Sequence, residues 1–81
     1  MYITILVFGE LKKRINSDRL TISTDLPISA VELLNLVESL KPELGYLLKY
    51  CSLATNGELA NTQTLIQANE EVALLPPVSG G

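Results

Sequence analysis

The residues best suited to chemistry are the last six of the chain, Pro76, Pro77, Val78, Ser79, Gly80 and Gly81. Proline lacks a backbone N–H and fixes φ, so the two prolines end strand pairing and keep the following chain extended. Glycine lacks a Cβ, so the two glycines allow the backbone to enter a narrow channel. The reactive group of this segment is the α-carboxylate of Gly81. The pattern therefore predicts a protein whose own C-terminus is activated as a substrate; a frayed chain end is the alternative, and the paired prolines argue against it.

The remainder of the chain has few side chains of the types that act in catalysis. It contains no histidine and one cysteine, Cys51. Neither a transition-metal site nor a Cys–His nucleophile can therefore be assembled. We interpret Cys51 as a small buried hydrophobe, with a role as a sulfur relay as the less favoured alternative. A single cysteine cannot form an internal disulfide, which indicates a reducing compartment, and we expect a cytoplasmic protein.

Length and charge narrow the function classes further. The 81 residues are enough for one small domain, and a hydrophobic content of 47% excludes a disordered chain. The net charge of −3 argues against nucleic-acid binding. We interpret the short basic run Lys12-Lys13-Arg14 as solvated surface, with contact to a substrate phosphate as the alternative. No apolar run approaches the roughly 20 residues that span a bilayer, and residues 1–8 lack the features of a signal peptide, so we expect no membrane partner.

The elements that must position the C-terminal segment begin with two strands. Residues 2–8 are rich in β-branched and aromatic types and predict the first strand. Residues 20–23 alternate in polarity and predict a second strand, paired with the first as a hairpin. Between them, residues 12–19 are polar and contain the turn-favouring Asn16, Ser17 and Asp18, so we interpret this stretch as a turn.

A capping box at Ser29 and Glu32 predicts the start of a helix. In this motif the serine hydroxyl accepts from the Glu32 N–H, and the Glu32 side chain returns to the Ser29 N–H, while Ile28 and Leu33 form a hydrophobic staple. Apolar residues then recur at helical spacing and predict one buried stripe, Ala30, Leu33, Leu34, Val37 and Leu40. The Lys41-Pro42 pair ends the helix. Residues 43–50 are interpreted as a further short helical turn.

The second half of the chain predicts more strands. Residues 51–55 read as a strand that ends at an Asn56-Gly57 turn, a strong hairpin signal. Residues 59–65 are interpreted as a short edge strand, and residues 72–75 as the final strand, after a turn at residues 68–71. This element order predicts an α+β domain with a mixed sheet packed on one main helix.

If the first and last strands lie side by side in the centre of the sheet, the topology is a β-grasp, the ubiquitin-like fold. We therefore divide the chain into a β-grasp domain of residues 1–75 and an extended tail of residues 76–81.

Three segments carry a resemblance to a known family: residues 3–11, the Asn56-Gly57-Glu58 turn and residues 71–81. Together they resemble the MoaD family of β-grasp sulfur carriers, the small subunits of molybdopterin synthase. The terminal Pro-Pro-Val-Ser-Gly-Gly is the most specific part of the match. The chain departs from the family at Leu74-Leu75, where aromatic residues often stand, and residues 61–67 follow no useful motif.

The resemblance implies a division of labour between this chain and its partners. An ATP-dependent, E1-like partner would adenylate the carboxylate of Gly81, and sulfur would replace AMP to give a thiocarboxylate. The large subunit would hold the acceptor, cyclic pyranopterin monophosphate, and would supply the catalytic side chains within a heterotetramer. This chain itself would bind no cofactor, because ATP is consumed by the activating partner.

A carrier also needs a docking surface. If Ile3, Ile5 and Val7 face the core, strand alternation sends Phe8 to the opposite face. The same alternation in the last strand exposes Leu75, and the resemblance adds Leu59 at the border of this apolar patch. We expect the patch to bind the large subunit; the alternative is that these side chains fold over the rim of the core.

Three other functions remain open at this point. The chain resembles sulfur carriers of other pathways as well, such as thiamine thiazole synthesis or tRNA thiolation, although its length and paired prolines favour molybdopterin synthase. A ubiquitin-like protein modifier would use the same C-terminal glycine in an isopeptide bond to lysine. A β-grasp binding module with an idle tail would not use it at all.

Overall fold

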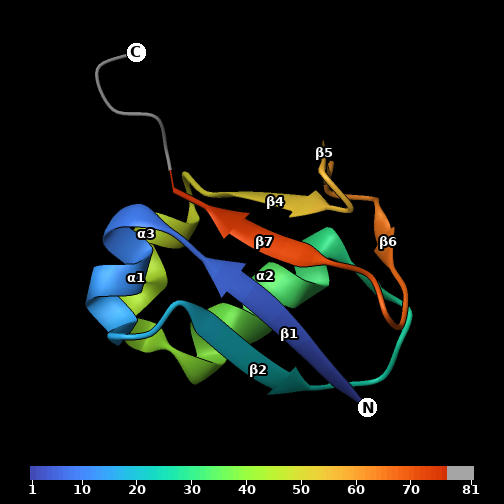
Figure 1. Cartoon of the computed structure of the whole chain (residues 1–81), viewed down its shortest axis with the longest axis horizontal. Helices are drawn as coiled ribbons and strands as arrows, with labels where there is room; N and C mark the ends of the chain where they lie inside the picture. The colour runs from blue at the N-terminus through green and yellow to red at the C-terminus, as the bar shows by residue number, and fades with distance from the viewer. Residues whose placement is uncertain (77–81) are drawn as a thin grey trace.

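The computed structural model describes residues 1–76, apart from the side chain of Tyr46. A five-stranded sheet with the order β2-β1-β7-β4-β5 forms one layer (Figure 1). Its strands, in that order, are β2 (Arg19–Ser23), β1 (Tyr2–Val7), β7 (Val72–Leu75), β4 (Ser52–Thr55) and β5 (Glu58–Leu59). A second, two-stranded sheet pairs β3 (Ile28–Ser29) with β6 (Leu65–Ile66). The helices are α1 (Gly9–Ile15), α2 (Ala30–Leu40), the 3₁₀ turn η1 (Pro42–Leu44) and α3 (Gly45–Leu48).

The first and last strands form the central pair of the main sheet, which confirms the predicted β-grasp. β1 runs parallel to β7, with Val7 opposite Leu74, and antiparallel to β2 on its other side. β7 in turn pairs antiparallel with β4, with Ser52 opposite Leu75. β7 therefore has a hydrogen-bonded neighbour on each side, and its C-terminal end lies beside the start of α1 (Figure 1).

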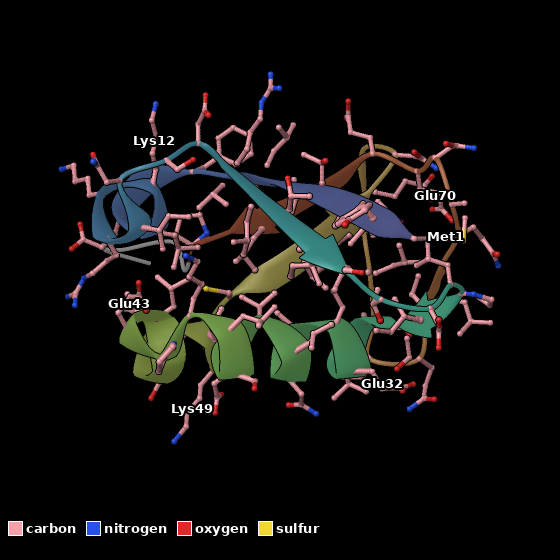
Figure 2. All side chains as sticks on the ribbon, turned by 90° about the horizontal axis from the view of Figure 1, so that it is seen from below. Met1, Lys12, Glu32, Glu43, Lys49 and Glu70 are labelled. Atoms are coloured by element: carbon pink, nitrogen blue, oxygen red, sulfur yellow. The ribbon has the colours of Figure 1, made fainter. Side chains whose placement is uncertain are left out.

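The core lies between the main sheet and α2, which runs across a single face of the sheet (Figure 2). Alternate residues of the two central strands fill it, namely Ile3, Ile5, Val7, Val72 and Leu74. From the helical side, Leu33 and Val37 of α2 and Leu44 of η1 are fully buried against them. Burying such a side chain stabilises the fold by about 1.5–3 kcal/mol, so this layer supplies most of the driving force for folding.

The capping box of α2 is present, with one difference in its hydrogen bonds. The Ser29 hydroxyl oxygen accepts from the Glu32 backbone N–H at 3.2 Å, as predicted. The Glu32 carboxylate accepts from the Ser29 hydroxyl at 2.8 Å, whereas the sequence predicted a bond to the Ser29 backbone N–H. The helix ends before Pro42 as predicted, and Leu40 is exposed, so its place in the buried stripe was wrong. The reason is that Leu40 lies in the last turn of α2, where η1 takes over the cover of the core.

The interpretation of residues 12–19 as a turn was wrong, because α1 occupies the first part of this stretch. Leu11 is buried and anchors the helix, and Glu10 forms an ion pair with Arg14 at 3.6 Å. The helix ends at Asn16, whose left-handed backbone places its N–H on the Lys12 carbonyl. β1 and β2 therefore pair as predicted, but a helix and a short turn connect them.

The predicted turn at Asn56-Gly57 is confirmed, and both residues have positive φ (51° and 83°), as a tight two-residue hairpin requires. The Asn56 side-chain oxygen accepts from the Glu71 N–H at 3.0 Å, which ties this turn to the start of β7. The single edge strand predicted over residues 59–65 was wrong. Its two ends belong to different sheets, because β5 pairs with β4 and β6 pairs with β3.

Candidate functional site: the tail root and the open face of the sheet

The predicted tail begins where β7 ends, at the edge of the described structure. Pro76 directly follows β7 and is half-buried. The other predicted tail residues, Pro77, Val78, Ser79, Gly80 and Gly81, lie outside the described residues. The structure therefore fixes the point from which the tail departs, which we call the tail root.

Gly9 packs directly against the tail root. It opens α1 with a φ of +59°, and a Cβ added to it would lie 3.0 Å from Cγ of Pro76. The sequence analysis did not single out Gly9 as a site residue. Its signal is in the strand register: since Val7 pairs with Leu74 in parallel, the same register continued by two residues brings Gly9 to Pro76.

The face of the main sheet that lies away from α2 carries an apolar row across four strands. Successive cross-strand partners share a face, and the register runs from Leu6 to Ala73, then to Ala54 and Leu59. Beyond this row, towards the tail root, lie Phe8 and Leu75. We call the six residues together the open face: Leu6, Phe8, Ala54, Leu59, Ala73 and Leu75.

The structure thus brings the three predicted docking residues to one side of the sheet. Phe8 is 45% exposed and Leu59 is 72% exposed, while Leu75 is half-buried between them. Leu75 is the last residue of β7, so the open face reaches the tail root without a break. A partner that covers this face would lie against the start of the tail.

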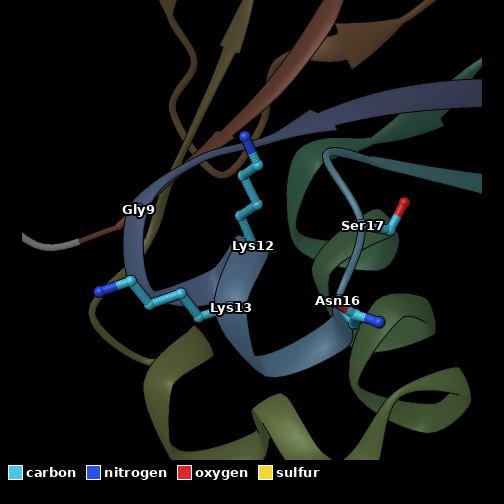
Figure 3. A pocket seen from close by; sticks show the side chains of 5 residues that line it. All are labelled: Gly9, Lys12, Lys13, Asn16 and Ser17. Carbon is cyan, nitrogen blue, oxygen red and sulfur yellow. The ribbon is translucent and has the colours of Figure 1, made fainter.

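A shallow hollow of about 480 Å³ lies beside the tail root, between α1 and the turn that follows it (Figure 3). It is lined by Gly9, Lys12, Lys13, Asn16 and Ser17. Lys12 is at the same end of the molecule as Glu43 and Lys49, while Glu70 and Glu32 lie at the other end (Figure 2). The basic run interpreted as solvated surface is exposed, as expected, and Lys12 and Lys13 line the hollow together with Gly9, the residue that packs against Pro76.

Comparison with known proteins identifies the family of the chain. The family model of the ThiS family matches residues 5–81. The chain belongs to the ThiS family. The match includes the tail, so the family pattern extends over both the described fold and the residues beyond it.

Individual relatives of this ThiS-family chain agree with its fold. The molybdopterin synthase sulfur carrier subunit of Dictyostelium discoideum is 38% identical over 82 aligned residues, which cover 95% of this chain and 93% of that protein. The complex of subunits 1 and 2 of the molybdopterin-converting factor from Helicobacter pylori matches with a TM-score of 0.66, 27% identity and full coverage of both chains. SAMP1 from Haloferax volcanii matches with a TM-score of 0.80, 26% identity and full coverage of both chains.

The cysteine of this ThiS-family chain is held as a neutral thiol. Cys51 precedes β4 and is half-buried, and its Sγ–H donates to the Leu47 carbonyl at 3.1 Å. Burial raises the pKa of the Cys51 thiol, which disfavours the nucleophilic thiolate. This environment favours the interpretation of Cys51 as a small core residue over a sulfur relay.

The described part of this ThiS-family chain shows neither a cluster of metal-binding side chains nor a membrane-spanning helix. In residues 1–76, no group of three or more His, Cys, Asp or Glu side chains is placed to hold a metal ion. The helices within the same residues are too short or too polar to cross a membrane.

Proposed function

We propose that this chain is the sulfur carrier subunit of a molybdopterin synthase, and that the carboxyl group of Gly81 carries the sulfur. The observation that carries this proposal is the 38% identity, over 95% of the chain, to the Dictyostelium protein of that name. The likeness to the Helicobacter complex of two molybdopterin-converting-factor subunits supports a larger partner subunit for this chain. A cytoplasmic location and a four-subunit assembly belong to the same proposal.

The chemistry proceeds in two steps before the sulfur reaches its acceptor. A carboxylate is a poor electrophile, so an E1-like enzyme first joins an oxygen of the Gly81 carboxylate to the α-phosphorus of ATP and releases pyrophosphate. Hydrosulfide, or its equivalent from a sulfur donor, then attacks the carbonyl carbon, the C–S bond forms, and AMP leaves with the oxygen. The product is a thiocarboxylate, whose sulfur is nucleophilic at neutral pH.

The sulfur is then transferred on the large subunit. The thiocarboxylate sulfur attacks a carbon of cyclic pyranopterin monophosphate and displaces the oxygen substituent of that carbon, and water then cleaves the remaining acyl C–S bond to restore the carboxylate of Gly81. Two such transfers deliver the pair of sulfur atoms of the dithiolene. This chain contributes the carrier group and its placement, while the side chains that move protons belong to the partner.

The open face is the part of this chain that docks on the large subunit. Phe8 and Leu59 expose apolar side chains on the face of the sheet that lies away from α2, and exposed apolar patches on small domains mark interaction surfaces. Because Leu75 joins this face to the tail root, docking delivers the tail to a fixed point on the partner. The exposed lysines of α1 line the hollow beside the tail root. Contact of Lys12, Lys13 and Arg14 with a phosphate of the substrate stays the alternative to their interpretation as solvated surface.

The test is the intact mass of the untagged protein after incubation with a molybdenum-cofactor-type adenylating enzyme, ATP and a sulfur donor. We expect a gain equal to the exchange of one oxygen for sulfur, and loss of that gain in a variant that lacks Gly81. The loaded protein is then mixed with the large subunit and cyclic pyranopterin monophosphate, and molybdopterin is measured.

Each alternative gives a different result in this experiment. Loading without transfer to the pterin would indicate a sulfur carrier of another pathway. Covalent conjugates of higher mass in a cell lysate would indicate a protein modifier. An unchanged mass, with an enzyme shown to load a known carrier, would contradict the proposal altogether.

A further inference from the structure

The side chain of Pro76 occupies space that only a glycine leaves free at position 9. An added Cβ on Gly9 would lie 3.0 Å from Cγ and 3.8 Å from Cβ of Pro76, and the first distance is tighter than nine in ten real Cβ contacts, so one of the two residues has to shift by a few tenths of an ångström. Gly9 also holds a φ of +59°, which L side chains rarely adopt. A side chain at position 9 therefore forces either the start of α1 or Pro76 to move.

Gly9 is on the better anchored side of this contact. Just before it, the Val7 N–H donates to the Asp18 carbonyl at 2.9 Å, which ties the end of β1 to the end of the α1 connection. Just after it, Leu11 is 1% exposed and fixes the helix in the core. The start of α1 is thus restrained from both directions.

Pro76 is therefore the residue that we expect to move when a side chain is added at position 9. It lies one residue beyond the last cross-strand pair of β7, Ser52 with Leu75, and it has no backbone N–H with which to extend the ladder. Its packing on Gly9 therefore restrains the direction in which the chain leaves the sheet. A displacement here moves the base of everything that follows.

We infer that Gly9 is a positioning residue, and that its missing side chain aims the tail at the acceptor held by the large subunit. This inference rests on the proposed sulfur-carrier function. The contact acts through geometry: Gly9 packs against Pro76 and sets where Pro76 lies when the open face is docked.

A double-mutant cycle tests the inference. Thiocarboxylate forms of the wild type, Gly9→Ala, Pro76→Ala and the double variant are made by thiolysis of intein fusions, so that no variant depends on the adenylating enzyme. Single-turnover sulfur transfer to cyclic pyranopterin monophosphate is measured at saturating large subunit, and the affinity for that subunit is measured separately.

We expect Gly9→Ala to slow the transfer step about tenfold or more, because small misplacements of reacting groups are costly, with little change in affinity. In the Pro76→Ala background the same substitution should have little effect. Alanine lacks the Cγ, and the remaining Cβ of residue 76 lies 3.8 Å away, an ordinary contact.

Gly57→Ala is the matched control. Gly57 also has positive φ (+83°), but an added Cβ there meets no atom within 4 Å, so this variant carries backbone strain without a contact. We expect wild-type transfer from it. Equal slowing by Gly9→Ala in both backgrounds, or no slowing in either, would overturn the positioning role. A wild-type protein that transfers no sulfur would instead overturn the proposed function and this inference with it.

Discussion

The two faces of the main sheet are built from the same strands but differ in how far their side chains are exposed to solvent. On the helix side, Ile5, Val7 and Leu74 are at most 1% exposed. On the other side, Leu6 and Leu75 are half-buried and Phe8 is exposed. The residues alternate along the same strands, so the difference is due to what covers each face and not to composition.

β2 is an example in this chain of a strand with one solvent-exposed face. Its outward residues Arg19, Thr21 and Ser23 are polar and exposed, while Leu20 and Ile22 are buried, which is the usual alternation of a strand with one solvated side. The central strands depart from this alternation towards the tail root, where Leu6, Ala73 and Leu75 place apolar side chains on the outward side as well. A near-continuous apolar strand is typical of a sheet covered on both faces, which agrees with the proposed docking of a partner on the open face.

The largest expected effect tests the buried face. Leu74→Ala removes a fully buried side chain from β7 and should lower the free energy of unfolding by about 2–5 kcal/mol. Its neighbour Leu75, on the open face, is the matched control, and Leu75→Ala should cost clearly less. Urea denaturation measures both. Equal losses would mean that both faces of β7 are core, and the contrast between them would fail.

The next effect tests the open face where it approaches the tail root. Phe8→Asp should weaken binding to the large subunit by about 2 kcal/mol or more, as expected for an aromatic anchor, and change stability much less. Tyr2→Asp is the control, because Tyr2 is an exposed aromatic residue at the start of β1, at the far end from the tail root, whereas Phe8 directly follows the end of β1. Titration calorimetry gives the affinities. An unchanged affinity for Phe8→Asp, with a large loss of stability, would place Phe8 in the core.

A smaller effect locates the border of the open face. Leu59→Ala should weaken the same complex by about 1 kcal/mol and leave stability nearly unchanged, since the side chain is largely exposed. Leu65→Ala is the matched control, because Leu65 is also exposed but lies in β6, outside the main sheet. If both variants bind the large subunit equally well, the docking surface does not reach Leu59 in β5.

The smallest effect concerns the thiol. Cys51→Ala should load and transfer sulfur at wild-type rates. Because burial raises the pKa of the Cys51 thiol in the fold, its contribution to stability is complete below the pKa of the unfolded thiol and is lost as pH rises through the folded value. Denaturation of wild type and Cys51→Ala in mildly alkaline solution should therefore converge with rising pH. A variant that fails to load would make the cysteine a sulfur relay.

Strong local signals made much of the fold predictable. The capping box at Ser29, the Asn56-Gly57 turn and the apolar strands each specify their structure over a few neighbouring residues. α1 was missed because its seven residues include a glycine and four charged side chains, with Leu11 as its one fully buried member. β3 was missed because two residues become a strand only through their pairing with β6, which lies far away in the sequence.

The residues of the candidate site likewise fall into those that local sequence predicts and those that only long-range contacts reveal. Strand alternation predicts the side on which Phe8 and Leu75 lie, because period two is a local property. The place of Leu59 beside them depends on the register of three consecutive strand pairs, and the resemblance supplied it in advance. The role of Gly9 follows only from the contact between two residues that are 67 positions apart, so no local pattern announces it.

The position of β7 between β1 and β4 also determines how the molecule bears a mechanical load. A pull applied at Pro76 along β7 acts across the hydrogen bonds to both neighbours, which run perpendicular or slanted to the strand. These bonds therefore share the force in shear, whereas an edge strand pulled sideways would peel away one bond at a time. An enzyme that pulls on the end of this chain would therefore meet the combined resistance of these hydrogen bonds at β7, and we expect the sheet to stay folded.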